Sequence, residues 1–451
     1  MVKGDLARQT KDFHAKYGDI VRTAPDELSF INDSAWRDIY ACRTGHQSFP
    51  KTKIWYGMPS LGKRGPPKRP DSILNANDAQ HSRIRKLFSH SFSEKALAEQ
   101  EPLIQSYIDL LISQLKKQVV TSKGSVVNIS TWYNYRTFDI IGDLGFGESF
   151  KCLEDVKYHA WVETIISKFK AGTMGLAMQY YPAGRWSLQN WVPQSLIDDL
   201  VKQAQFTDEK VRHRLSLNVD RPDFLSEIQK HNDEKGMTLE EIVETSEVLI
   251  IVGSDTTAST LSGITNYLVK NPEAFDKLVK EIRETFNKES LITSSGVSNL
   301  RYLNAVIQEG LRLCPPMPDG FRRNVPLSDT VCGDWLPEGT IVKFSTWAGF
   351  VSPFNFARPT EFLPERWLPK DSSSSSDFDN DNRKILHPFA IGPRNCIGQN
   401  LAWIELRLIL ARVIWNFDMS LPVGSSGLDY EKLKSFRVWD KKPVDVVLTP
   451  V

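Results

Sequence analysis

The sequence predicts one large, mainly α-helical domain with a few small β-sheets. Apolar residues make up 41% of the 451 residues and charged residues 25%, values that are ordinary for a globular chain. From about residue 78 to residue 290 helical patterns dominate, whereas strand-like alternation is confined to short segments. No linker separates compositionally distinct halves and no repeat is evident. We therefore expect residues 1–451 to form a single domain.

The order of the elements follows from local patterns. A helical pattern covers 5–17, and two short strand-like segments follow at 19–24 and 27–31. The stretch 51–75 is rich in Lys, Arg, Gly and Pro, which predicts a long loop. The serine run that begins at Ser372 predicts a flexible surface insertion over 371–382.

Two helices in the second half carry recognisable ends. Thr238-Leu-Glu-Glu241 is a capping box, and it opens a helix of about 30 residues. A further amphipathic helix covers 299–313 and is ended by Pro315 and Pro316. Turn residues then divide the segment 325–345 into short strands.

Charge and cysteine usage exclude several classes of protein. The net charge of +1 argues against a nucleic-acid binder, which would carry a basic excess. The five cysteines show neither a disulfide pattern nor metal-type spacing, which indicates free thiols in a reducing compartment. No segment approaches the roughly 20 apolar residues of a membrane span, and the N-terminus has no signal-peptide pattern.

Cys396 is the most informative residue of the chain. It lies in an apolar loop bounded by Gly392 and Gly398, directly before an amphipathic helix, with Arg394 two residues away. Backbone N–H groups and the helix dipole at a helix N-terminus favour a thiolate, and the glycines permit turns that a Cβ would resist. A thiolate held in this way suits an axial haem ligand. The alternative is a buried structural cysteine.

A second motif lies in the middle of the long helix. Val252-Gly-Ser-Asp255-Thr256-Thr places a glycine and short polar residues where they weaken a helix. An acid and a hydroxyl that face a pocket could hold water and relay protons. A polar face toward solvent is the alternative.

Two further pairs lie at helical spacing. Glu309 and Arg312 share a helix face at i and i+3, and Arg366 follows downstream in a proline-bounded loop. His81 and Arg85 lie one helical turn apart. Taken alone, both patterns are typical of solvated charged faces.

The cysteine loop carries a resemblance to a known family. Phe389, Gly392, Arg394, Cys396 and Gly398 match, position for position, the haem-binding loop of the cytochrome P-450 family. The other motifs occur in the family's order, so the resemblance covers nearly the whole chain. It implies the family's fold, a mainly α domain with minor β-sheets that encloses one haem b, with Cys396 as the axial iron ligand.

The resemblance also implies roles for the other motifs. Asp255 and Thr256 would deliver protons to bound oxygen, and Val252 stands where the family usually has a small residue, so it would crowd the substrate pocket. Glu309, Arg312 and Arg366 would form a buried structural network. The cations expected to bind the haem propionates are His81, Arg85, Arg323 and Arg394. Arg322 could exchange roles with Arg323, which is preferred for its spacing to Pro326.

The implied reaction is a monooxygenation. One oxygen atom from O2 enters a C–H or C=C bond of an apolar small molecule, and electrons come from NADPH through a cytochrome P-450 reductase. Segments such as Phe138–Glu148 resemble filamentous-fungal members, which often act in secondary metabolism. Two alternatives stay open: a haem-thiolate isomerase, dehydratase or coupling enzyme, and a non-catalytic haem sensor. The intact Asp255 and Thr256 disfavour both.

The resemblance also predicts where in the cell the protein is located. Family members of eukaryotes usually begin with a membrane anchor, whereas this chain begins about where the first catalytic-domain helix is expected. The anchor is either absent from the natural protein or missing from this sequence. We therefore expect an intracellular protein at the surface of the endoplasmic reticulum, with peripheral membrane contact left open.

Overall fold

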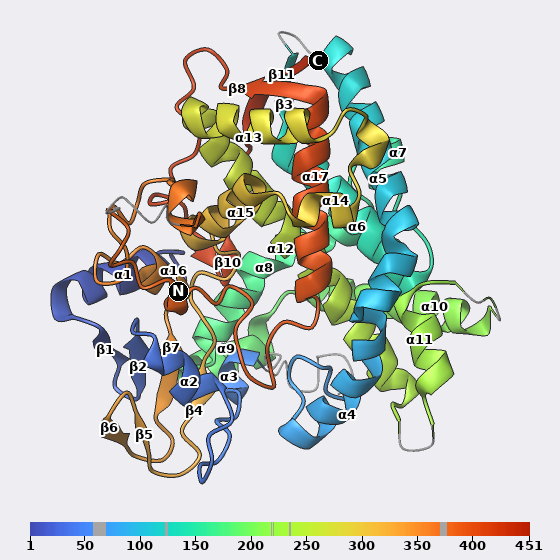
Figure 1. Cartoon of the computed structure of the whole chain (residues 1–451). Helices are drawn as coiled ribbons and strands as arrows, with labels where there is room; N and C mark the ends of the chain where they lie inside the picture. Colours follow the sequence, from blue (N-terminus) through green and yellow to red (C-terminus); the bar gives the residue numbers. More distant parts are fainter. Residues whose placement is uncertain (57–68, 122–124, 218, 220, 234–235, 370–376) are drawn as a thin grey trace.

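The predicted class, mainly helical with small sheets, is confirmed by the structure. The computed structural model describes residues 1–56, 69–121, 125–217, 219, 221–233, 236–369 and 377–451 (Figure 1). The N-terminal elements are α1 (Leu6–Tyr17), β1 (Ile20–Ala24), β2 (Glu27–Phe30), α2 (Ser34–Tyr40) and α3 (Lys53–Tyr56). The first three lie where the sequence predicts them, and α3 falls inside the stretch expected to be a loop.

The middle of the chain is almost entirely helical, apart from one short strand. Its elements are α4 (Asp78–Ser89), α5 (Glu94–Thr121), β3 (Val126–Asn128), α6 (Ile129–Phe146), α7 (Cys152–Asp155), α8 (Ala160–Met178), α9 (Pro182–Trp191), α10 (Gln194–Ser216), α11 (Phe224–His231), α12 (Leu239–Lys270), α13 (Pro272–Thr285), α14 (Ser294–Ser298) and α15 (Arg301–Leu313).

The last third carries most of the strands. Its elements are β4 (Arg323–Asn324), β5 (Asp329–Val331), β6 (Asp334–Leu336), β7 (Ile341–Phe344), α16 (Thr346–Phe350), α17 (Gln399–Asn416), β8 (Phe417–Ser420), β9 (Ser435–Phe436), β10 (Val438–Trp439) and β11 (Asp445–Pro450). The main sheet has the order β1-β2-β7-β4, and β3-β11-β8 form a second sheet. Two hairpins, β5-β6 and β9-β10, complete the strands of the described residues.

Helix α12 runs through the core and presents the central motif. The predicted capping box opens it: Thr238 Oγ1 accepts from the Glu241 N–H (3.2 Å), and the Glu241 carboxylate accepts from the Thr238 N–H (3.0 Å). The expectation that no segment approaches the length and apolarity of a membrane span is wrong for α12, which alone among the described helices meets both conditions. Its apolar window is 67% buried inside the protein, which is the pattern of a core helix.

Helix α17 positions the cysteine loop against this core. It contacts α5, α12 and α15, and its side chains Leu408, Ile409 and Val413 are fully buried. Since the loop enters α17 at Gly398, the packing of this helix fixes the C-terminal end of the loop.

The predicted surface insertion needs one correction. Residues 370–376, which include the serine run, lie outside the described residues. At the other end of the predicted 371–382 segment, the side chain of Asp381 is fully buried and pairs with Arg366. The predicted insertion therefore extends too far toward its C-terminal end. A local polar pattern does not reveal that Asp381 pairs with Arg366, which lies outside the segment.

Candidate functional site

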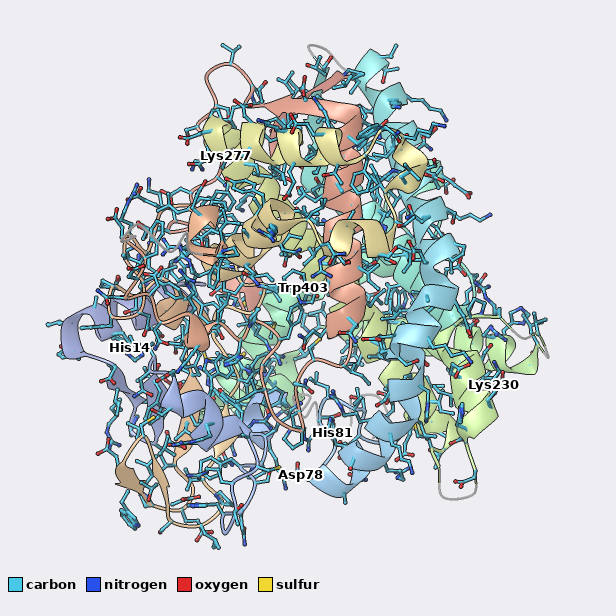
Figure 2. All side chains as sticks on the ribbon, viewed as in Figure 1. His14, Asp78, His81, Lys230, Lys277 and Trp403 are labelled. Carbon is cyan, nitrogen blue, oxygen red and sulfur yellow. The ribbon has the colours of Figure 1, made fainter. Side chains whose placement is uncertain are left out.

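The loop 389–398 is fixed by backbone hydrogen bonds. The Cys396 N–H donates to Phe389 O (2.9 Å), and the Asn395 N–H donates to Gly392 O (3.1 Å). Gly392 has φ +77°, and a Cβ there would lie 2.0 Å from Tyr40 O, so only glycine fits. The phenyl ring of Phe389 lies near Trp403 of α17, with ring centroids 6.2 Å apart (Figure 2).

The expectation that Gly398 also needs special backbone freedom is wrong. Gly398 has φ −87°, a conformation open to any L residue, and a Cβ there would meet Phe92 at an ordinary 3.7 Å. Neither the backbone conformation nor contacts with other protein atoms therefore require glycine at position 398.

Cys396 lies in this loop within electrostatic reach of Arg85 of α4. Its side chain is accessible. The protein atoms around it nevertheless desolvate the thiol and raise its pKa, while the Gly398 N–H and the Arg85 guanidinium act in the opposite direction. The prediction that the loop by itself favours the thiolate is therefore wrong for the free thiol. A bound metal cation deprotonates a coordinating thiol outright, so the residue keeps the chemistry of a metal ligand.

Arg85 ties helix α4 to this loop. Its guanidinium donates to the main-chain oxygen of Asn395 (2.6 Å) and to Asn395 Oδ1 (2.7 Å). His81 lies one turn earlier, and Figure 2 shows it beside Asp78 on the same helix. Burial, followed by the charges of Arg394, Lys51 and Arg85, lowers the pKa of His81 to about 3. His81 is thus neutral near pH 7 and not the cation that the sequence suggested.

Arg323 and Arg394, two of the three arginines predicted to act with His81, have unsatisfied N–H groups. Arg394 donates through Nη2 to Ala76 O (2.7 Å) and Asp78 Oδ1 (2.6 Å). Its Nη1 is buried without an acceptor in the described residues, and so is Nε of Arg323. Each group would gain a hydrogen bond from an anionic oxygen.

Lys51 joins this cluster without any signal in the sequence. It forms an isolated β-bridge with Arg323, and its ammonium donates to Leu74 O (2.5 Å). Burial, with Arg323 and Arg394 adding to it, holds the pKa of Lys51 far below its usual range. Lys51, Arg323 and Arg394 thus lie within electrostatic reach of one another, with Asp78 as their acidic neighbour. This surplus of buried positive charge fits the two carboxylates of a haem.

The choice between the adjacent arginines is supported by geometry. Arg322 donates to both carboxylate oxygens of Glu27, at 2.9 and 3.2 Å. Its charge is already compensated, whereas Arg323 forms no ion pair within the described part of the chain and lies 5.6 Å from the Tyr40 ring centroid.

Val252 and Thr256 share one face of α12 that borders open space. The Thr256 hydroxyl donates to Val252 O (2.8 Å), one turn earlier. Val252 is 44% exposed, although most of α12 is buried. An exposed valine on a core helix shows that this part of α12 is not covered by the protein's own side chains.

Asp255 points to a different neighbour. Its Oδ1 pairs with Lys441 Nζ at 2.6 Å, and Lys441 also donates to Asn134 Oδ1 (2.7 Å). Its Oδ2 is buried without a partner among the described residues. The structure therefore does not bring the Asp255 carboxylate into hydrogen-bond contact with the Thr256 hydroxyl. Sequence reasoning missed Lys441, which belongs to no motif.

A small cavity, with mainly apolar walls, adjoins Lys441. It has a volume of about 20 Å³, enough for one water molecule, and its lining includes Lys441, Ser130 and Ser259. The hydroxyl of Ser259 lies one turn after Asp255 and is buried without a partner in the described chain.

Glu309, Arg312 and Arg366 meet in a fully buried network. Arg312 donates to both Glu309 oxygens (2.9 and 2.7 Å), and Arg366 Nε donates to Glu309 Oε1 (3.1 Å). Trp367 Nε1 and the Leu363 N–H also donate to Glu309, and Arg366 pairs with Asp381. All the charged side chains of this network are 0% exposed. It joins α15 to the segment 363–381, which precedes the cysteine loop.

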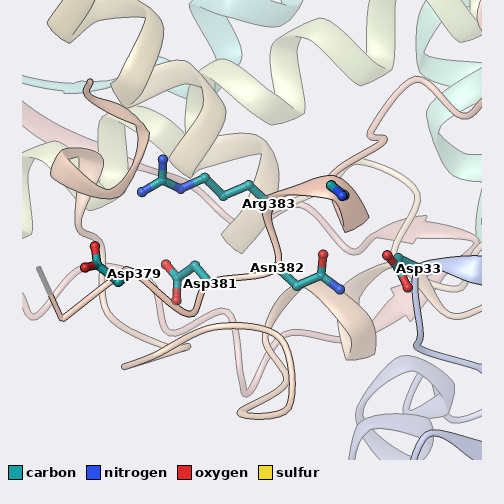
Figure 3. Close-up of a pocket in the computed structure, with 6 residues that line it drawn as sticks. Asp33, Asp379, Asp381, Asn382 and Arg383 are labelled. Atoms are coloured by element: carbon teal, nitrogen blue, oxygen red, sulfur yellow. The ribbon is translucent and has the colours of Figure 1, made fainter. Parts of the chain in front are cut away.

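A surface pocket of about 390 Å³ lies on the same segment (Figure 3). Its lining residues are Asp33, Asp379, Asp381, Asn382, Arg383 and Lys384. Of its acidic lining residues, Asp381 is already paired with Arg366. No cluster of three or more metal-type ligands occurs among the described residues.

Comparison with known proteins gives a consistent result. The family profile of Cytochrome P450 matches residues 2–446. The cytochrome P450 monooxygenase lcsI of Purpureocillium lilacinum is 40% identical over 456 residues, which cover 100% of this chain and 86% of the relative. The cytochrome P450 monooxygenase astA of Talaromyces wortmannii is 41% identical, covering 100% of this chain and 88% of the relative. For atr2 of Stereocaulon alpinum, also a cytochrome P450 monooxygenase, the identity is 40%, with 100% and 87% covered.

Proposed function

The chain belongs to the cytochrome P450 family, and from this premise we propose that it is a haem-thiolate monooxygenase. It inserts one oxygen atom from O2 into an apolar small molecule, by hydroxylation or epoxidation. The observation that carries the proposal is the loop 389–398, which holds an accessible Cys396 between fixed backbone hydrogen bonds and the Arg85 guanidinium.

The cofactor we propose is haem b. When bound, it supplies the oxidising chemistry, and its thiolate ligand favours O–O cleavage. Cys396 would hold the iron. Arg323 and Arg394 would hold the carboxylates through their unsatisfied N–H groups, with Lys51 adding charge. Arg85 and neutral His81 would contribute from α4, and Phe389 and Gly392 would shape the loop.

Thr256 and Asp255 both carry protons, and their side chains lie on different faces of α12. The Thr256 hydroxyl lies on the open face and can hold a proton or a water molecule there. The Asp255 carboxyl pairs with Lys441, which lines the small cavity, and a water molecule held there can supply protons. Transfer between the two requires rotation of the Asp255 side chain or one bridging water molecule.

The biological setting follows from the relatives. They include monooxygenases of several fungi, so we propose a step in fungal secondary-metabolite biosynthesis. Electrons come from NADPH through a cytochrome P450 reductase, at the membrane surface of the endoplasmic reticulum.

Spectroscopy tests the haem-thiolate assignment. The reduced carbon monoxide complex of the wild type should show the red-shifted Soret band, and Cys396→Ala should lose it. Cys42→Ala is the matched control, since Cys42 is also accessible but lies outside the loop. A normal spectrum from the Cys396 variant overturns the assignment.

Turnover with reductase, NADPH and candidate pathway intermediates then tests the reaction class. A product that gains one oxygen atom, with NADPH and O2 consumed, supports monooxygenation. A product that gains no oxygen atom identifies an isomerase, dehydratase or coupling enzyme, and of these only the coupling enzyme consumes NADPH and O2. Ligand binding without any product identifies a sensor.

A further inference from the structure

Arg437 occupies the tip of the β9–β10 hairpin in a strained conformation. Phe436 pairs directly with Val438, so the turn between the two strands is this single residue. Its φ is +73°, a region that residues with a Cβ rarely adopt. Such strain persists only where the surroundings impose it, and it often marks a functional site.

Both strands of the hairpin are anchored, which explains why the strain persists. On one side, the Ser435 N–H donates to Gly4 O (2.7 Å). On the other, Trp439 Nε1 donates to Pro315 O (2.8 Å), and its ring packs against Trp347, with centroids 5.3 Å apart. The backbone therefore presents Arg437 from a rigid support.

The guanidinium of Arg437 packs against an aromatic ring, and the residue as a whole is half-buried. Its Cζ lies 5.4 Å from the ring centroid of Trp55, and the same ring carries Arg322 at 3.7 Å. Burial lowers the pKa of Arg437, and the Arg322 charge adds to this, while Tyr56 and Asp319 oppose it.

Arg437 makes no hydrogen bond or ion pair to any residue in the described ranges. Other arginines with buried side chains do pair with carboxylates: Arg136 with Glu405, Arg214 with Asp223, Arg312 with Glu309 and Arg322 with Glu27. Arg323 also lacks an ion pair there, but it belongs to the cationic cluster that fits the haem carboxylates. Arg437 is not accounted for by that cluster.

Two neighbouring donors share this lack of an acceptor. Nη1 of Arg322 and the hydroxyl of Tyr56 are both buried without a partner in the part of the chain that the structure describes. Tyr56 lies within electrostatic reach of Arg323, Arg437 and Arg322, and so links this group to the proposed haem site. Strand β9 also contacts α8, and Figure 1 shows β10 close to this helix.

We propose that Arg437, Tyr56 and Nη1 of Arg322 form an oxyanion subsite of the substrate pocket. The substrate is then an apolar molecule that carries one acidic group, with a carboxylate as the simplest case. A guanidinium is the side chain best suited to bind such a group through charge-assisted hydrogen bonds. This inference rests on the proposed function, because it names the substrate class of the same enzyme.

Calorimetric titration of the haem-loaded protein at neutral pH tests the subsite without turnover. The probes are two matched pairs, dodecanoate with dodecanamide and 2-naphthoate with 2-naphthamide. Each acid should bind about tenfold or more tightly than its amide, the effect of a charge-assisted hydrogen bond. Equal affinity within both pairs, or no binding by either acid, overturns the proposal even if no variant can be purified.

Three variants locate the effect. Arg437→Gln should remove the preference for the acids, Arg437→Lys should retain part of it, and Arg301→Gln, an exposed arginine on α15, should leave it unchanged. An acid preference that survives in Arg437→Gln overturns the assignment. Loss of haem from Arg437→Gln would assign the residue to the cofactor instead and also overturns it. The carbon monoxide spectrum, recorded separately, reports whether the proposed haem-thiolate function itself fails.

Discussion

Val252 stands where the family usually has a small residue, and the structure places it on an exposed face of α12. Its side chain is 44% exposed on the same face of α12 as Thr256, and a β-branched side chain has few rotamers in a helix. Val252→Ala should therefore enlarge the pocket and broaden the product profile on one accepted substrate, measured as the product ratio. Val269→Ala, on the same helix but buried, is the control. An unchanged ratio at normal haem content would show that Val252 does not restrict the substrate.

Thr256 is the hydroxyl on the open face of α12. Thr256→Ala should retain haem and substrate binding but divert NADPH electrons to hydrogen peroxide, measured as peroxide formed per NADPH consumed. Thr260→Ala is the matched control, because Thr260 lies one turn further along and donates to Thr256 O (3.0 Å). Tightly coupled turnover in Thr256→Ala would assign proton delivery to another group.

Lys441 holds the other proposed proton carrier in place. In Lys441→Met the Asp255 carboxylate would stay buried without its cation, which should lower the free energy of unfolding by about 1–3 kcal/mol, less than for a fully buried pair. Peroxide release should also rise, since Asp255 loses Lys441, which connects it to the small cavity. Chemical denaturation and peroxide assays measure the two effects, and Lys441→Arg should restore both.

The adjacent lysine provides the control for this pair. Lys442 bridges to Asp440 at 3.1 Å with more than half of its side chain exposed, so Lys442→Met should change neither quantity. If Lys441→Met behaves like Lys442→Met, the ion pair with Asp255 has no role in stability or in proton supply.

Single residues show where sequence reasoning was sufficient and where it failed. Arg323 could be separated from Arg322 by its spacing to Pro326, and the Glu27 pair of Arg322 supports that choice. Lys51 and Lys441 could not be found, because each acts through a contact between segments far apart in the chain. His81 was read as a cation, since a sequence does not show how far burial lowers a pKa.

At the scale of elements, local patterns predicted helix ends well. The capping box at Thr238 opens α12 because both of its hydrogen bonds lie within one turn. The pair formed by Glu309 and Arg312 was equally visible, but its burial was not. The burial comes from Arg366 and Asp381, which reach the pair from a segment more than fifty residues away.

The Glu309 network should be essential for the position of the cysteine loop. Glu309→Ala strands two buried guanidinium groups, and breaking a buried pair costs about 3–5 kcal/mol. We expect protein that is insoluble or free of haem, measured as soluble yield and haem per chain. Glu273→Ala, which removes an exposed carboxylate paired with Lys277, is the control. A soluble, haem-loaded Glu309 variant would contradict the structural role.

The same network predicts how stability depends on pH. Burial tends to raise the pKa of Glu309, but Arg312 and Arg366 outweigh it and hold the pKa below its ordinary value. The stabilisation is therefore complete above the unfolded pKa of about 4.3 and is lost as the pH falls through the folded value. We expect the denaturant concentration at the unfolding midpoint to decrease once the pH drops below about 4. A flat profile there would contradict the prediction.

At the scale of the whole molecule, fold class and element order could be predicted, but the site could be only partly assembled. Periodicity and turn residues fix helices and strands locally. The position of Cys396 relative to Val252 depends instead on how α4, α12 and the loop 389–398 pack together, which no local pattern encodes. The resemblance supplied this arrangement, and the exposure of both side chains agrees with it.

The cationic cluster makes the stability of the whole molecule depend on its cofactor. Lys51, Arg323 and Arg394 are held close together with Asp78 as their acidic neighbour, so they repel one another when no dianion is bound. Salt screens such repulsion. Raising KCl from about 0.05 to 0.5 M should therefore raise the melting temperature of the haem-free protein more than that of the haem-loaded protein. Scanning calorimetry of both forms measures the difference, and Arg394→Gln should reduce the salt effect in the haem-free form. Equal salt responses of the two forms would show that the cluster is not compensated by the cofactor.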